Sequence, residues 1–315
     1  MKGGKKRLLS GVKPTGKPHM GNYFGAMKQF VDLQGHYDCF YMVADYHGLN
    51  FIQNAEEMRS LTYDLVRDYL GIGLDPKEVT IFKQSDVPQH TELAWIFDTI
   101  TTMPYLMRAH AFKDAEAKDK EISVGTFNYP MLMAADILLY DTQIVPVGQD
   151  QKQHIEYARD TAEKFNRIFG DTFVLPEALI HENVAVVPGT DGKKMSKSYG
   201  NTIPLFGTKE EIGGAVMSIV TDSSGERPEN VYAIHSLLRP EAELAPLYEE
   251  RKGKYKDLKE ALIEDLEAVV APMRAKRDSI TDADVKDVLK RGAEMAGEKA
   301  RAKMEKVKEM VGVTI

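Results

Sequence analysis

Apolar residues in the first third of the chain alternate between short runs and longer stripes at helical spacing. The short runs predict strands at residues 8–12, 40–44 and 79–82. The stripes predict helices over 21–35 and 54–69, the second with Asn54 as its N-cap and Gly71 past its end. Strands that alternate with helices in this order predict a Rossmann-like, doubly wound parallel α/β sheet, with ligands at the carboxyl ends of the strands.

The middle of the chain is mostly helical in pattern. Helical spacing predicts further helices over residues 93–107, 131–140 and 151–169. A short apolar run predicts an extended segment at 144–147, and the polar, glycine-containing stretch 188–201 predicts an irregular loop.

The last third has no strand pattern. An amphipathic stripe over 258–273 predicts one helix, and Thr281 with Asp284 predicts a capping box that opens another, running with interruptions toward Val311. We therefore expect two domains, a Rossmann-fold catalytic domain with a helical insertion over residues 1–203 and an α-helical domain over residues 204–315.

Composition places the chain among cytoplasmic globular proteins. Of its 315 residues, 43% are hydrophobic and 28% charged, and no window approaches the length of apolar sequence that a membrane span needs. The basic start is followed by too short an apolar run for a secretory signal. The single cysteine, Cys39, excludes an internal disulfide and any cysteine-built metal cluster within one chain.

The net charge of −7 argues against non-specific adhesion to DNA or RNA, although it leaves room for a local basic face. Basic residues of the last helix alternate with acidic ones. A solvated helix face and an RNA-binding face explain this pattern equally well. Those basic residues are Lys286, Lys290, Arg291, Lys299, Arg301, Lys303 and Lys306.

Two short motifs carry the candidate chemistry. The first, residues 18–22 with the sequence PHMGN, lies where a loop enters a helix after the first strand, a place where backbone amides and an imidazole can bind phosphate. The second, residues 194–198 with the sequence KMSKS, lies in the irregular loop. Lysines on a mobile loop suit phosphoryl transfer, because the charge that they stabilise grows only as the reaction proceeds. Either motif alone is weak evidence, since loop histidines and basic surface loops are common.

The two motifs in this order resemble the HIGH and KMSKS signatures of class I aminoacyl-tRNA synthetases. Segments 10–16, 129–138 and 145–154 are further similar to the bacterial tryptophanyl-tRNA synthetases. The resemblance implies a ligase that makes tryptophanyl-adenylate and pyrophosphate from L-tryptophan and ATP, then transfers tryptophan to the 3′ end of tRNA(Trp). It also implies a homodimer and an anticodon-binding role for residues 204–315.

The resemblance also assigns residues to a tryptophan site. Asp136 would accept a hydrogen bond from the indole N–H, and Met133 would pack on the ring. Tyr129 and Gln151 would hold the substrate ammonium group. Further residues would line the indole pocket: Leu9, His47, Val145 and Val147.

An ATP site follows in the same way. Lys194 and Lys197 would stabilise the transition state together with His19, and Mg²⁺ would be carried mainly by the ATP phosphates, with no metal site built from protein side chains. The full set implied to bind ATP comprises Lys13, Thr15, His19, Gly21, Asn22, Gly148, Asp150, Lys194, Met195, Ser196 and Lys197.

Some positions depart from the family pattern. Lys13 stands where many relatives have glutamine, Leu9 where they have phenylalanine, and Ala115 where they have a phosphate-contacting lysine that Lys113 or Lys118 could replace. Three other functions remain open. Tyrosyl-tRNA synthetases share the fold, but they typically have glutamine at the position of Met133. A small nucleotidyltransferase would not need the helical domain, and a non-catalytic paralogue would not need the motif lysines.

Overall fold

Five parallel strands form one sheet in the computed structural model, in the order β3-β2-β1-β4-β5. The structure describes residues 4–109, 112–113, 116, 121–148, 152–180, 187–221 and 227–314. The strands are β1 (Arg7–Val12), β2 (Asp38–Val43), β3 (Thr80–Lys83), β4 (Ile144–Val147) and β5 (Glu177–Ile180). The predicted Rossmann-like sheet is therefore confirmed, and β5 is a strand that the sequence pattern did not reveal.

Alternate residues of the strands supply two separate cores. Leu8 of β1 packs in one cluster with Tyr41 of β2, whereas Leu9 packs in the other with Phe40. Because both faces of a parallel sheet are covered by helices, its strands are apolar at successive positions, which explains why they appear as short unbroken runs in the sequence.

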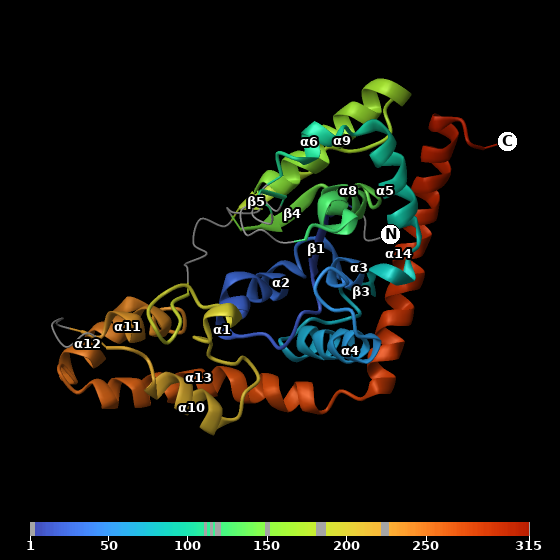
Figure 1. Ribbon diagram of the computed structural model, residues 1–315. Helices are drawn as coiled ribbons and strands as arrows, with labels where there is room; N and C mark the ends of the chain where they lie inside the picture. Colours follow the sequence, from blue (N-terminus) through green and yellow to red (C-terminus); the bar gives the residue numbers. More distant parts are fainter. Residues whose placement is uncertain are drawn as a thin grey trace.

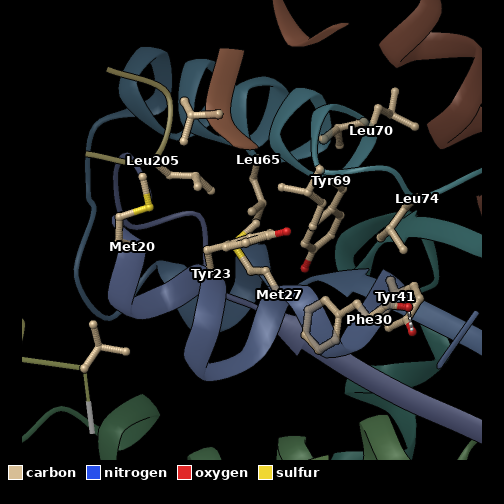
Figure 2. Close-up of a cluster of buried hydrophobic side chains, with 14 of the residues drawn as sticks. Met20, Tyr23, Met27, Phe30, Tyr41, Leu65, Tyr69, Leu70, Leu74 and Leu205 are labelled. Carbon is tan, nitrogen blue, oxygen red and sulfur yellow. Dashed lines mark hydrogen bonds between the residues drawn. The ribbon is translucent and has the colours of Figure 1, made fainter. Parts of the chain in front are cut away.

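Helices α1 (Met20–Asn22) and α2 (Lys28–Leu33) are joined by a π-helical turn, η1 (Tyr23–Met27), so the predicted helix over 21–35 is confirmed with a local widening. Together they cover the first face with α4 (Ala55–Gly71). Figure 2 shows this cluster, with Met20 and Tyr23 facing Leu65 and Tyr69.

The predicted cap of α4 is confirmed, because the Asn54 side chain accepts hydrogen bonds from the backbone N–H groups of Glu56 and Glu57 at 3.0 and 2.9 Å. The prediction for Gly71 was wrong. Gly71 is the last helical residue, and the left-handed residue is Gly73 at φ 115°. A Cβ atom on Gly71 would lie 2.9 Å from that of Arg277, so close packing explains this glycine.

The second face is covered by α5 (Gln89–Ile100), α6 (Met103–Leu106), α8 (Val124–Leu138) and α9 (Lys152–Phe169), while α3 (Asp45–Gly48) follows β2. The single helix predicted over 93–107 is in fact two. Thr101 and Thr102 are extended, and Pro104 then lies in the first turn of α6. Backbone N–H groups in the first turn have no partner within the helix, so the missing N–H of proline breaks no hydrogen bond there. Helix α8 begins well before the predicted start and contains Pro130.

The remaining helices are α10 (Lys209–Met217), α11 (Glu229–His235), α12 (Glu241–Glu250), α13 (Tyr255–Asp278) and α14 (Asp282–Val311). The capping box at Thr281 and Asp284 is confirmed, but α14 continues without the predicted interruptions. Helices α10 to α13 gather on one side, whereas α14 runs back along the sheet against β3 and α5 (Figure 1). Within the described ranges, no helix is long and apolar enough to cross a membrane.

Candidate active site

The two sequence motifs, about 170 residues apart, meet beyond the carboxyl end of β1. The backbone N–H of Met20 donates to the carbonyl of Ile203 at 2.9 Å, and that of Leu205 donates to the carbonyl of Pro18 at 3.1 Å. Leu205 also lies beside Met20 in the core below (Figure 2). The segment that follows the KMSKS loop is thus fastened to the segment that holds His19.

Gly21 and Met195 form the closest contact between the motifs. The Met195 sulfur lies 3.2 Å from the Gly21 nitrogen, and the Met195 side chain is buried. A Cβ atom on Gly21 would lie 2.9 Å from His19 Nδ1 and 3.2 Å from Met195 Cβ. Only glycine fits here without displacing its neighbours. Asn22 completes this turn, since its side chain accepts a hydrogen bond from the His19 N–H at 3.1 Å.

His19 is buried and uncharged. Its side chain is 7% exposed, and burial, followed by the nearby positive charge of Lys197, lowers its pKa to about 4. Nδ1 of His19 has no hydrogen-bond partner among the residues that the structure describes. At neutral pH, this free ring nitrogen of a neutral imidazole can donate or accept one hydrogen bond with a ligand, depending on the tautomer.

Asn201 organises the KMSKS loop. Its side-chain oxygen accepts from the Ser196 N–H at 2.8 Å, and its amide donates to the Lys194 carbonyl at 3.2 Å and to Asp191 at 2.6 Å. Asn201 is buried, whereas both motif lysines, Lys194 and Lys197, are exposed. The loop therefore has a fixed backbone and projecting cationic side chains.

Lys197 extends over the turn that follows β1. A Cβ atom on Gly16, whose φ is 113°, would lie 3.3 Å from the Lys197 ammonium. Desolvation by the surrounding protein lowers the pKa of Lys197, although the residue as a whole is exposed. In the same turn the N–H of Thr15 donates to the carbonyl of Lys13 at 2.8 Å. The Lys13 ammonium itself lies over the ring of Phe51, 4.5 Å from its centre.

A second group of polar residues lies on the α8 side of the sheet, around the buried carboxylate of Asp136. His47 Nε2 lies 2.8 Å from Asp136 Oδ2, while Gln84 Nε2 and His90 Nδ1 lie 2.7 and 2.6 Å from Oδ1. Burial alone would raise the pKa of Asp136, but His90 and His47 outweigh it and lower the pKa to about 2. Asp136 is therefore a buried anion at neutral pH.

Apolar residues surround this anion. Leu9 and Val145 are buried in one cluster, and Met133 and Val147 pack against it while partly exposed. Tyr129 lies at the edge, with its ring 6.2 Å from that of His47 and its hydroxyl 2.6 Å from His154 Nε2. The expected tryptophan-site residues that the structure describes thus share one region.

The expected ATP residues divide between described and undescribed parts of the chain. Gly148 follows β4 at the carboxyl edge of the sheet, next to the turn after β1. Asp150 and Gln151 lie outside the described residues, as do Ala115 and Lys118, while Lys113 is exposed.

Sequence reasoning missed Gln84, His90 and Asn201. Asn201 stood at the end of the predicted loop, and a buried polar side chain could have been suspected there. Gln84 and His90 had no such signal, because they reach Asp136 across 52 and 46 residues of sequence.

Comparisons with known proteins show which family the chain belongs to. The family model described as "tRNA synthetases class I (W and Y)" matches residues 1–283. The chain therefore belongs to the class I tRNA synthetases for tryptophan and tyrosine. It is 48% identical to a tryptophan–tRNA ligase of Fusobacterium nucleatum over 98% of both chains, and 46% identical to one of Rhodopirellula baltica over 98% and 99%. Within the class, it belongs to the tryptophan–tRNA ligases.

A solved structure supports the same assignment. The crystal structure of a tryptophanyl-tRNA synthetase from Campylobacter jejuni, complexed with ADP and tryptophan, matches this chain with a TM-score of 0.91. The two are 41% identical, and the match covers 97% of this chain and 99% of that one. The fold and the family are thereby established over nearly the whole length.

Proposed function

We propose that this chain activates L-tryptophan with ATP, forming tryptophanyl-adenylate and pyrophosphate, and then transfers the tryptophanyl group to the 3′ end of tRNA(Trp). The observation that carries the choice of amino acid is the ionised, buried carboxylate of Asp136 on the side of the sheet where the apolar cluster of Leu9 and Val145 lies. Indole has one hydrogen-bond donor and no acceptor. A charged hydrogen bond to that donor contributes about 1.5–3 kcal/mol.

The pocket around Asp136 also rejects competitors. Phenylalanine would leave the buried carboxylate without a partner, which is a strong basis for discrimination. Tyrosine would need a polar partner for its hydroxyl, and Met133 offers only a thioether. In this proposal Met133 packs on the indole, Tyr129 and Gln151 hold the ammonium group, and the pocket is lined by Leu9, His47, Val145 and Val147.

On the other side of the site, the motif residues bind ATP. His19, Gly21 and Asn22 contact the nucleotide at the start of α1, with Met195 near the adenine and Gly148 and Asp150 near the ribose. Lys13, Thr15 and Ser196 complete the set.

A carboxylate oxygen of tryptophan attacks the α-phosphorus, forming one P–O bond while the bond to the β-phosphate oxygen breaks. Lys194 and Lys197 stabilise the charge that develops on the leaving pyrophosphate, and neutral His19 donates a hydrogen bond without adding a charge. Mg²⁺, carried by the ATP phosphates, would neutralise part of their charge. Among the described residues there is no cluster of three or more histidine, cysteine or acidic side chains that could hold a metal ion.

The helical part, residues 204–315, is the part that we propose binds the anticodon arm of tRNA. Helices α10 to α13 lie to one side of the sheet, and α13 contacts α4 (Figure 1). Helix α14, which follows α13, packs against β3 and α5. RNA bound on α10 to α13 would therefore be linked to the catalytic part through direct helix contacts. Because its substrate is a tRNA used in translation, we place the enzyme in the cytoplasm.

A homodimer is the proposed assembly. Large apolar side chains are exposed on α5, α6 and α8, among them Trp95 at 71%, Met103 at 67% and Val124 at 78%. The helices α5 and α8 are joined nearby by the hydrogen bond from Asn128 to Asp98 at 2.7 Å. Exposed apolar side chains gathered on adjoining helices favour a protein interface. Sedimentation should show a dimer, and Trp95→Lys should shift it toward monomer.

The first test is amino-acid-dependent ATP–pyrophosphate exchange with the twenty amino acids in parallel. We expect exchange with tryptophan alone. Lys197→Ala should lower kcat by about 10²- to 10³-fold, because it removes a charge that acts mainly in the transition state. The exposed Lys256→Ala on α13 is the matched control and should leave exchange unchanged.

A second variant tests the indole contact. Asp136→Ala should raise the KM for tryptophan by about tenfold to a hundredfold, because the charged hydrogen bond is lost. Exchange with tyrosine instead of tryptophan would indicate a tyrosyl-tRNA synthetase. Exchange with no amino acid would indicate a non-catalytic paralogue.

A further inference from the structure

The carboxylate of Asp136 is held by more protein groups than a simple hydrogen-bond acceptor for substrate requires. An ionised carboxylate has about four acceptor positions, two on each oxygen. Gln84 and His90 both donate to Oδ1, whereas His47 is the partner of Oδ2 among the residues that the structure describes. One acceptor position, on Oδ2, is thus left for a ligand, and indole supplies one N–H.

The two oxygens face different surroundings. His90 is fully buried, and its ring stacks on Phe82 of β3, with ring centres 6.1 Å apart. His47 is 9% exposed and lies edge-on to Tyr129, which belongs to the proposed tryptophan site. Oδ1 therefore points to the core and Oδ2 to the pocket.

Asp136 and Tyr140 contact the two ring nitrogens of His90. The Tyr140 hydroxyl lies 2.7 Å from His90 Nε2, and His90 Nδ1 lies 2.6 Å from Asp136 Oδ1. Because Asp136 is ionised, it can only accept, so Nδ1 of His90 must carry a proton. The Tyr140 hydroxyl is the partner of the other ring nitrogen, Nε2. Tyr140 is itself buried between the rings of Phe40 and Phe82.

We propose that His90 is a specificity-determining positioning residue: together with Gln84 it occupies Oδ1 of Asp136, so that the remaining acceptor position on Oδ2 faces the indole N–H. His90 does not touch the substrate in this arrangement. Without His90, the Asp136 carboxylate could rotate or take up a proton. The site would then no longer discriminate between ligands with and without an N–H group. The inference rests on the proposed tryptophan activation.

The test compares L-tryptophan with β-(benzothiophen-3-yl)-L-alanine, in which sulfur replaces the indole N–H at nearly the same shape. The readout is the ratio of kcat/KM for the two amino acids in pyrophosphate exchange by the full-length enzyme. In the wild type this ratio should be about 10- to 100-fold in favour of tryptophan, the range of one charged hydrogen bond.

His90→Leu should lower the ratio by about fivefold or more, because the oriented acceptor is lost. His90→Asn, whose amide can place a donor near the position of Nδ1, should keep the ratio within about twofold of the wild type. Leu93→Val, a buried substitution on the same helix, is the control for altered packing of α5 and should also keep it.

A purely structural role for His90 predicts a different result. Both amino acids would then lose activity by the same factor in His90→Leu, and an unchanged ratio would overturn the proposal. If His90→Leu does not fold, Gln84→Met decides, because Gln84 is the other donor to Oδ1: the ratio should fall, and an unchanged ratio overturns the proposal. A wild-type enzyme without tryptophan-dependent exchange would instead refute the proposed function, before any variant is compared.

Discussion

Gly292 is the point where α14 crosses the sheet, and its replacement by alanine gives a sharp test of the fold. A Cβ atom on Gly292 would lie 1.7 Å from the carbonyl oxygen of Ile81 and 3.2 Å from the Cα of Phe82. These are backbone atoms of β3, and Ile81 is paired with Tyr41 of β2. Strand β3 cannot shift without disturbing its pairing in the sheet, so α14 would have to move away from it.

The expected effect combines two opposing terms. Alanine favours a helix over glycine by about 1 kcal/mol, whereas overpacking a core typically destabilises by about 1–3 kcal/mol and sometimes more. Here the obstacle is backbone, and withdrawal of α14 would also loosen the buried Val288, Leu289 and Ala296. We therefore expect Gly292→Ala to lower the free energy of unfolding by about 3 kcal/mol, the upper end of the overpacking range.

Urea unfolding measures this difference through the midpoint concentration at constant m-value. Gly297→Ala in the same helix is the matched control, because its nearest neighbour is the flexible guanidinium of Arg301 at 3.0 Å. That variant should change the free energy of unfolding by less than about 1 kcal/mol. Equal midpoints for the two variants would refute the close crossing of α14 over β3.

Three further predictions concern the motif region. Gly21→Ala should raise the KM for ATP by about tenfold and leave the KM for tryptophan unchanged, because the added methyl group would press on His19 and Met195. An unchanged KM for ATP in exchange kinetics would contradict this. Asn201→Ala should lower the rate of adenylate formation in single turnovers by about tenfold or more, because the Ser196 N–H loses its acceptor; a wild-type rate would show that the loop holds its shape without Asn201. The free energy of unfolding should rise with pH between about 4 and 6.5, since burial lowers the pKa of folded His19 to about 4 and the unfolded chain binds that proton more tightly; His19→Gln should flatten the urea midpoint across this window.

Local patterns in the sequence predicted most of the sheet because both of its faces are buried. Four of the five strands were visible as apolar runs, and the caps at Asn54 and Thr281 depend only on residues within one turn. β5 escaped notice because its burial is incomplete, so that it has no unbroken apolar run. Elements whose cause is local were thus predictable, and those whose cause is tertiary were less so.

Glycine positions show how a tertiary cause escapes a local pattern. Gly71 looks like a helix terminator, but it is required by the close approach of Arg277, more than 200 residues away. Gly292 lies in the helix that was predicted with interruptions, and it is likewise required by β3. A glycine in a single sequence does not reveal whether it provides a backbone angle or the space for another element. The same applies to His90, whose partner Asp136 is known only once α5 and α8 pack together.

The order of the strands explains why the two halves of the site meet. From β1 the chain winds outward through β2 and β3, then returns to place β4 on the other side of β1. The segments that follow β1 and β4 therefore diverge, which is the arrangement that typically provides a binding site at the carboxyl edge of such a sheet. The helix after β1 packs on the first core, while Leu9 and Val145 face the second, where Asp136 lies. The groups that we propose bind phosphate and indole thus approach the same edge from opposite faces of the sheet, as a reaction between ATP and the amino acid's carboxylate requires.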